Sequence, residues 1–152
     1  MKSFESVVNK ELRKVCEWLN TNKLSLNTSK SNFVIFHPFQ RKPDYNVTLK
    51  MYDSEFKILT SLEQKHHVKY LGFLIDSHLS WRYHIVYISS KISKGVGTIA
   101  RLRHFVPTST LLKIYRSLIE PYIFYGLIVW GQAANSSLNK ILILQKRALR
   151  LM

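Results

Sequence analysis

The stretch KYLGFLIDSHLSWRYHI, residues 69–85, decides the fold because the pattern of the chain changes within it. Its bulky apolar first part predicts a strand over Val68–Asp76 that breaks at Gly72. From Trp81 onward apolar residues recur every three or four positions, which predicts a long helix. A single carboxylate, Asp76, lies where the two patterns meet. It could be a catalytic group, a metal ligand or the residue that ends a strand.

Residues 1–80 are predicted to form one helix and a small antiparallel sheet. An apolar stripe at three- and four-residue steps predicts an amphipathic helix over residues 3–19. A β-branched and aromatic run predicts a strand at 32–36, and alternation around Tyr52 predicts a hairpin over residues 46–59. So small a sheet should leave an apolar face exposed. The candidates for that face are Phe33, Ile35, Val47 and Leu49.

Residues 81–152 are predicted to form a bundle of three or four helices. The first helix should run from Trp81 to about Arg103, with Ser80 as its N-cap. Together with the first half, this predicts an α+β chain with domains at 1–80 and 81–152.

Proline and serine residues set the expected limits of the later helices. A second helix should open at Pro107, and Pro121 should break or kink it, since proline lacks an N–H and clashes with the preceding turn. A helical remnant should follow over residues 122–130. Ser136 or Ser137 should cap the last helix.

Charge is unevenly distributed along the chain. The sequence has 23 Lys and Arg residues against 9 Asp and Glu, a formal charge of +14. Residues 82–152 carry 11 of the basic side chains and one acidic side chain, Glu120. A basic half with interspersed aromatic residues favours a polyanion partner, most often nucleic acid, over an ordinary solvated surface. Lys91, Lys94 and Arg101 share one arc of the predicted helix, so they are the candidate contacts to a nucleic-acid backbone.

Cysteine usage and hydropathy indicate the compartment. A single cysteine, Cys16, cannot form an internal disulfide, which fits the reducing nucleus or cytoplasm. The most apolar run, residues 122–130, has about half of the ~20 residues that a membrane span requires. We therefore expect an intracellular chain with no membrane partner.

No complete catalytic or metal site is visible in the sequence. His66 and His67 are adjacent, so they point to opposite faces of a strand and cannot easily share a metal. Two-metal phosphoryl transfer needs at least two acids that hold cations about 3.5–4 Å apart. Asp53 and Glu55 flank a predicted turn, where solvent exposure is the usual explanation, and Asp76 has no acidic neighbour. We predict no catalytic and no metal-binding residue.

Four segments, taken in order, resemble the end of the reverse transcriptase of jockey-like non-LTR retrotransposons. They are WLNTNKLSLNTSKSNFVIF, VKYLGFLIDSHLSWRYHI, RSLIEPYIFYGLIVWG and LQKRALRLM. The resemblance covers residues 4–152. It implies the last part of the polymerase palm in residues 1–80 and the helical thumb from Trp81 onward. The family enzyme is an RNA-directed DNA polymerase, a nucleotidyltransferase for which Mg²⁺ is implied.

The resemblance also implies roles for individual residues. Lys30 matches the lysine of a palm loop, although without a nucleotide site it is expected to be a solvated loop residue. Tyr70, Leu71 and Gly72 match the primer grip, the strand and turn that hold the growing 3′ end. Gly72 would let the backbone approach a primer closely, and the alternative is a β-bulge without a ligand. Asp76 would end the strand beside the junction of palm and thumb.

The sequence departs from the family at the catalytic site. The family's Tyr-x-Asp-Asp turn precedes the first helix, and this sequence contains no such motif. We therefore expect a fragment without metal ligands or cofactor, inactive by itself, from a truncated, degenerate or co-opted element copy. Its expected partners are a template–primer duplex such as an RNA–DNA hybrid, and the upstream palm and fingers segments. The alternative is an interaction or structural relic with no nucleic-acid ligand.

Overall fold

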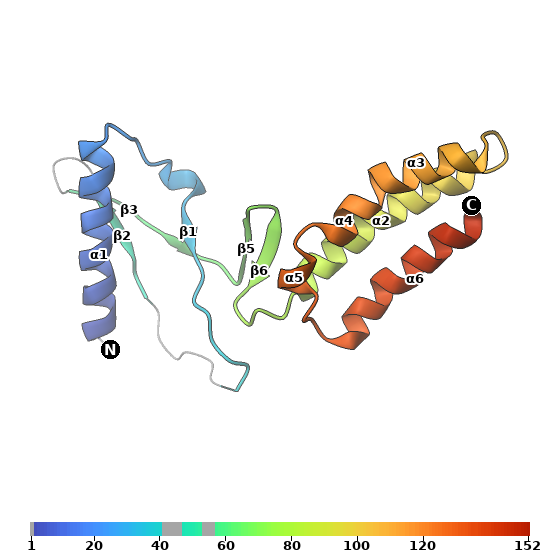
Figure 1. The fold of residues 1–152 in the computed structure, drawn as a ribbon. Coiled ribbons are helices and arrows are strands. Elements are labelled where there is room, and N and C mark those ends of the chain that lie inside the picture. Colours follow the sequence, from blue (N-terminus) through green and yellow to red (C-terminus); the bar gives the residue numbers. More distant parts are fainter. Residues whose placement is uncertain (1, 41–46, 53–56) are drawn as a thin grey trace. The chain divides into compact units, whose positions relative to one another are not determined.

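The computed structural model describes residues 2–40, 47–52 and 57–152, and the chain divides into two compact units, Met1–Val68 and Lys69–Met152. Unit 1 combines a helix with short strands, and unit 2 combines a hairpin with helices (Figure 1). The predicted α+β class is confirmed. The boundary between the units falls after Val68, so residues 69–76, which form most of the hairpin that precedes the helices, belong to unit 2.

Unit 1 is built on helix α1 (Lys2–Thr21) and the antiparallel strands β2 (Lys50–Tyr52) and β3 (Ile58–Ser61). These confirm the predicted first helix and hairpin, and residues 53–56, around which the hairpin was expected to turn, lie outside the described residues. The side chain of Asn9 joins α1 to the backbone beside β2. Its Nδ2 donates to the Thr48 carbonyl at 3.0 Å, and its Oδ1 accepts from the Lys50 N–H at 2.8 Å.

The second strand pair of unit 1 is parallel. Strand β1 (Asn32–Phe33) pairs with β4 (Glu63–Gln64), and the 3₁₀ turn η1 (Thr28–Lys30) precedes it. The single antiparallel sheet predicted for residues 1–80 is therefore divided into separate two-stranded sheets, two of them in unit 1, and the predicted strand at 32–36 ends at Phe33, where its two-residue partner ends.

The apolar side chains of unit 1 are buried differently from the prediction. Leu49 is buried at 8% exposure and directly precedes β2, which contacts α1, so its expected exposure is wrong. Phe33, Ile35 and Val47 are half-buried.

Unit 2 begins with a hairpin, in which the predicted strand over Val68–Asp76 is interrupted. Strands β5 (His67–Tyr70) and β6 (Phe73–Asp76) pair around a two-residue turn at Leu71 and Gly72. Both turn residues have positive φ, 46° and 86°, as the tightest hairpin turns require. The predicted break at Gly72 is confirmed, because the chain reverses at this turn and leaves a strand on either side.

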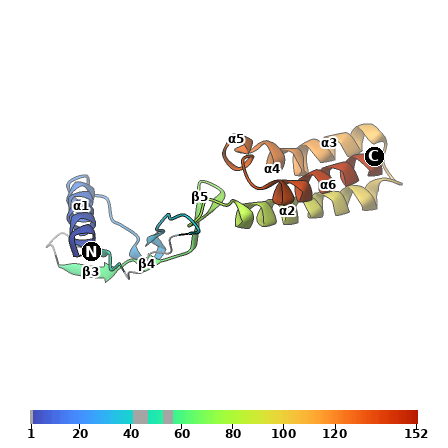
Figure 2. The ribbon, with the colours of Figure 1, turned by 90° about the horizontal axis from the view of Figure 1, so that it is seen from below.

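The helices of unit 2 lie side by side along most of their length (Figures 1 and 2). They are α2 (Arg82–Leu102), α3 (Thr108–Leu118), α4 (Glu120–Phe124), α5 (Leu127–Trp130) and α6 (Asn135–Leu151). The predicted break at Pro121 is confirmed, since proline falls in the first turn of α4, where its missing N–H costs nothing.

Two predicted helix caps are wrong. The N-cap position of α2 is Trp81, in the left-handed region and without a side-chain cap bond, rather than Ser80, although the Ser80 Oγ accepts from the Arg82 N–H at 3.4 Å. Helix α6 starts at Asn135 with Ala134 as its N-cap, and Ser136 and Ser137 lie inside its first turn.

The core of unit 2 forms around the apolar stripe of α2. Ile85, Ile88, Ile92, Val96 and Ile99 are at most 3% exposed, which confirms the predicted stripe. Other members of the core come from α3, α4, α5 and α6. None of the helices described is long and apolar enough to cross a membrane.

Candidate nucleic-acid interface

A buried carboxylate fixes the start of α2. Asp76 is 3% exposed, and its Oδ1 accepts from the His78 and Ser80 N–H groups at 3.0 and 3.1 Å. Its Oδ2 accepts from the Ser80 hydroxyl at 3.1 Å and from the Trp81 N–H at 3.0 Å. Leu79 and Trp81 both adopt positive φ, so these four bonds hold a strained connection between β6 and α2. Asp76 is thus the residue that ends a strand, and it orients the helix that follows.

The turn of the hairpin is attached to the helices by Tyr125. The Tyr125 hydroxyl donates to the Leu71 carbonyl at 2.6 Å, and its ring stacks on Phe73 with centroids 5.0 Å apart. A Cβ on Gly72 would lie 3.3 Å from the Tyr125 ring, so glycine permits this close approach as well as the positive φ. Beside the pinned turn, the Tyr70 and Leu71 side chains are 62% and 69% exposed. The predicted primer-grip residues therefore lie together on a fixed turn.

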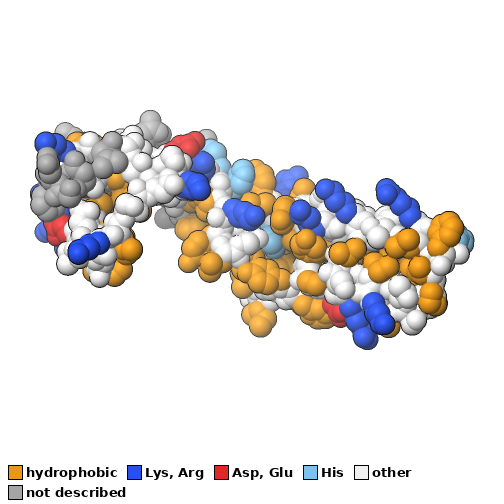
Figure 3. Space-filling model, turned by 90° about the horizontal axis from the view of Figure 1, so that it is seen from above, with side chains coloured by type: hydrophobic (Ala, Val, Ile, Leu, Met, Phe, Trp, Pro, Cys, Tyr) orange, Lys and Arg blue, Asp and Glu red, His pale blue; other side chains and the backbone are white. Residues whose placement is uncertain are grey.

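The three basic residues predicted on α2 lie away from its buried stripe. Lys94 and Arg101 are exposed, and Lys91 is half-buried with its Nζ 5.5 Å from the centre of the Tyr87 ring. None of the three forms an ion pair with a carboxylate among the described residues. At 1.5 Å per residue, Lys91 and Arg101 are separated by about 15 Å along the helix axis. Figure 3 shows Lys and Arg side chains recurring along the helical unit with few acidic ones beside them.

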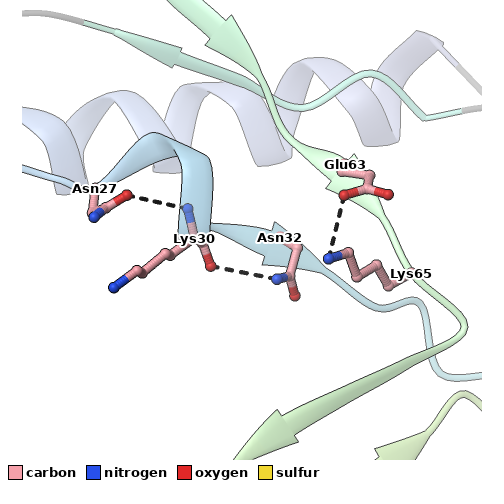
Figure 4. A network of polar contacts seen from close by, with 5 residues as sticks. All are labelled: Asn27, Lys30, Asn32, Glu63 and Lys65. Carbon is pink, nitrogen blue, oxygen red and sulfur yellow. Dashed lines mark hydrogen bonds and ion pairs between the residues drawn. The ribbon is translucent and has the colours of Figure 1, made fainter.

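Lys30 lies in unit 1, in a small polar network shown in Figure 4. Its N–H donates to Asn27 Oδ1 at 3.2 Å, and its carbonyl accepts from Asn32 Nδ2 at 3.4 Å. Nearby, Lys65 pairs with Glu63 at 3.3 Å. The Lys30 amine points away from these groups and the residue is exposed, which fits a solvated loop lysine.

His84 occupies the core rather than the basic face of α2. It is 2% exposed and packs against the rings of Phe73 and Trp130, with centroids 5.3 and 6.1 Å away. Its Nδ1 accepts from the Leu74 N–H at 3.4 Å, so the neutral ring carries its hydrogen on Nε2, which has no partner within the part of the chain that the structure describes. Burial lowers the pKa of His84 below its ordinary value because the imidazolium would lose its hydration.

The described residues do not fit a Mg²⁺ site. No group of three His, Cys, Asp or Glu side chains within 2–40, 47–52 and 57–152 is close enough to hold a metal ion. The buried Asp76 carboxylate already accepts four hydrogen bonds from its own loop. Asp53 and Glu55, the other acids considered, lie outside the described residues.

Sequence reasoning found the basic residues of α2 but missed Tyr125 and the hydrogen bonds of Asp76. The spacing of basic and apolar residues along one helix is visible in the sequence. The bond from Tyr125 to Leu71 spans 54 positions, and no local pattern reports such a contact.

Comparisons with known proteins identify relatives of this chain. It is 40% identical over 91 residues to the RNA-directed DNA polymerase from mobile element jockey of Drosophila melanogaster, covering 57% of this chain and 10% of that protein. It is 29% identical over 138 residues to the probable RNA-directed DNA polymerase from transposon X-element of Drosophila melanogaster, covering 89% of this chain and 14% of that protein. The jockey polymerase of Drosophila funebris is 34% identical over 93 residues, 59% of this chain and 10% of that protein.

The chain thus spans only about a tenth to a seventh of the length of these relatives. No family model and no solved structure matches it.

Proposed function

Because the chain is homologous to part of the RNA-directed DNA polymerases of jockey-like and other non-LTR elements, we propose that it holds template–primer nucleic acid by its phosphate backbone. In this proposal unit 2 acts as a thumb, with α2 as the contact helix. The hairpin turn of Tyr70, Leu71 and Gly72 acts as the primer grip. Unit 1 is the end of the palm, and its Lys30 takes no part in nucleotide binding.

The observation that carries the proposal is the exposed basic face of α2. Lys91, Lys94 and Arg101 have no carboxylate partner among the described residues, so a phosphate would not have to displace one. Asp76 fixes the start of the same helix, so the cations are held on a rigid element. Cations spread over about 15 Å of a helix can contact successive phosphates of a strand. Base edges are instead read by side chains that enter a groove and form two parallel hydrogen bonds.

Catalysis by the chain alone is not part of the proposal. Phosphoryl transfer by this class of enzyme depends on metal-bound carboxylates, and no such cluster is present among the described residues. The 152 residues purified alone should therefore incorporate no nucleotide in primer extension with Mg²⁺ or Mn²⁺ on a primed RNA template. Incorporation clearly above a boiled control would contradict this expectation.

Binding of an RNA–DNA hybrid tests the proposal. The variant that combines Lys91→Ala, Lys94→Ala and Arg101→Ala should bind the hybrid more weakly, whatever its sequence. The matched control combines Lys113→Ala, Arg116→Ala and Lys140→Ala, three exposed basic residues on α3 and α6 that remove the same charge.

If net charge alone attracts the hybrid, both triple variants will lose affinity equally, and the assignment of α2 will be wrong. If wild type binds no hybrid, the chain is a relic without a nucleic-acid ligand.

A further inference from the structure

Unit 2 has a cavity of about 690 Å³ between the hairpin and the helices α2 and α4. This volume is in the range of pockets that enclose one small ligand. Its lining includes Gly72 of the hairpin turn and His84 of the core, so it lies directly beside the turn pinned by Tyr125. We propose that the cavity receives one unpaired nucleotide of a bound strand, an inference that rests on the proposed function.

Aromatic side chains dominate the cavity. Tyr87 comes from α2, Tyr122 and Phe124 come from α4, and Tyr125 follows α4 directly. Phe124 and Tyr125 are 63% and 55% exposed, which leaves ring surface open to a ligand. Nucleobases unstacked from their neighbours bind on such rings, because every base presents a π-face.

Two cations accompany the aromatic rings. Lys69 Nζ lies 5.9 Å and Lys91 Nζ 5.5 Å from the centre of the same Tyr87 ring. A base stacked in the cavity would place its phosphate near these two ammonium groups, which would neutralise it. No carboxylate lines the cavity, and within residues 69–152 the only acids are Asp76, which is hydrogen-bonded in its loop, and Glu120.

The cavity is continuous with the basic face of α2, because Lys91 belongs to that face and also contacts the Tyr87 ring of the cavity wall. A duplex held along α2 would therefore have the cavity at one end of its contact. His84 belongs to the lining as well, but its Nε2 is buried from solvent, so the aromatic rings and the two ammonium groups are the groups that would contact the nucleotide.

The test compares a fully paired DNA duplex with the same duplex carrying one bulged 5-iododeoxyuridine. Wild type should bind the bulged duplex at least about fivefold more tightly, the lower end of the effect of one base stacked on an aromatic ring. Long-wavelength ultraviolet light should cross-link the iodinated base to a peptide that contains Tyr87 or residues 122–125. Equal affinity for the two duplexes, or cross-links confined to other peptides, would overturn the proposal.

Three variants make the test specific. Tyr87→Leu and Phe124→Ala should each abolish most of the preference for the bulge while retaining affinity for the paired duplex. Phe124 is the safer variant because its side chain is largely exposed and contributes little to the core. Phe105→Ala, which removes an 82% exposed ring outside the cavity, should keep the full preference.

The outcomes separate this proposal from the one on which it rests. Loss of binding in the α2 triple variant, without any preference for the bulge, would leave the proposed function standing and overturn the cavity as a nucleotide site. Free uridine monophosphate supplies the same base and phosphate without a strand. If it occupies the cavity while the bulged duplex forms no cross-link there, the site takes free nucleotides and the proposal is wrong.

Discussion

Helix α1 of unit 1 and helix α2 of unit 2 have similar amphipathic patterns but very different surroundings. Phe4, Val15 and Trp18 on α1 are 54%, 50% and 60% exposed, whereas Ile88 and Ile99 on α2 are 2% and 0% exposed. Helix α2 packs against α3, α4 and α6, while α1 contacts the short strand β2. An apolar stripe therefore predicts that a helix forms, but the elements around it decide how much of the stripe is buried.

The difference between the units also separates the functional candidates. Lys30 in unit 1 has a fixed backbone and a side chain that extends into solvent. The cations of unit 2 stand on a helix whose start is fixed by a buried carboxylate and whose opposite face is packed. Rigid elements position charge better than loops do. The candidate nucleic-acid contacts on α2 are therefore held more rigidly than the Lys30 side chain. The following predictions test that difference.

The largest effect is expected from Asp76→Ala. Three backbone N–H groups and one hydroxyl lose their acceptor in a buried loop, so unit 2 should lose about 3 kcal/mol or more of stability. Amide hydrogen exchange across α2 in the full chain measures this loss.

The matched control for Asp76→Ala is Glu63→Ala in unit 1. It removes one carboxylate of an exposed ion pair and should cost at most about 1 kcal/mol. Equal effects of the two variants would show that the Asp76 contacts do not hold α2.

A smaller effect should distinguish two glycines of α2. A Cβ on Gly95 would lie 2.7 Å from the Cγ1 of buried Ile119, whereas a Cβ on Gly97 would have nothing within 4 Å. Gly95→Ala should therefore destabilise unit 2 by about 1–2 kcal/mol, and Gly97→Ala should stabilise it by about 0.5–1 kcal/mol through helix propensity. The sign of each change in thermal unfolding is the readout, and stabilisation by both would contradict the packing of α2 on Ile119.

The smallest effect concerns His84 and pH. Its pKa in the folded chain is lowered by burial, so below about pH 6.5 the unfolded chain binds a proton that the folded chain does not. Stability is therefore intact above this pH and falls as pH decreases, by at most about 1.4 kcal/mol per pH unit. Urea unfolding measured between about pH 5 and pH 7.5, a range that spans the pKa of about 6.5 of an unperturbed imidazole, follows this loss of stability.

His84→Gln should remove that part of the pH dependence, and His104→Gln, at an exposed position, should leave it in place. Identical pH dependence in wild type and His84→Gln would show that the ring is not buried in its neutral form.

Local patterns predicted the helices of unit 2 well, because a residue such as Ile92 can be placed on the apolar side of α2 from neighbours three and four positions away. The turn at Leu71 and Gly72 was expected from the break at Gly72 and from the resemblance to a primer grip, whereas the positive φ of Leu71 was not, since the apolar run continues through the turn. The cap expected at Ser80 was misplaced by one residue, since Trp81 directly precedes α2, although the Ser80 Oγ accepts from the Arg82 N–H at 3.4 Å. The cap expected at Ser136 or Ser137 failed because α6 already starts at Asn135. Local sequence patterns cannot identify a site residue such as Tyr125, because its role depends on a contact with a residue far away in the sequence.

The salt dependence of hybrid binding tests the central claim most directly, because each phosphate contact changes the slope of log K against log salt by about one unit. For an RNA–DNA hybrid, the variant lacking Lys91, Lys94 and Arg101 should show a slope smaller by about 2–3 than wild type. The control variant lacking Lys113, Arg116 and Lys140 should retain the wild-type slope. Equal slopes for wild type and the α2 variant, with helicity unchanged by circular dichroism, would contradict the account.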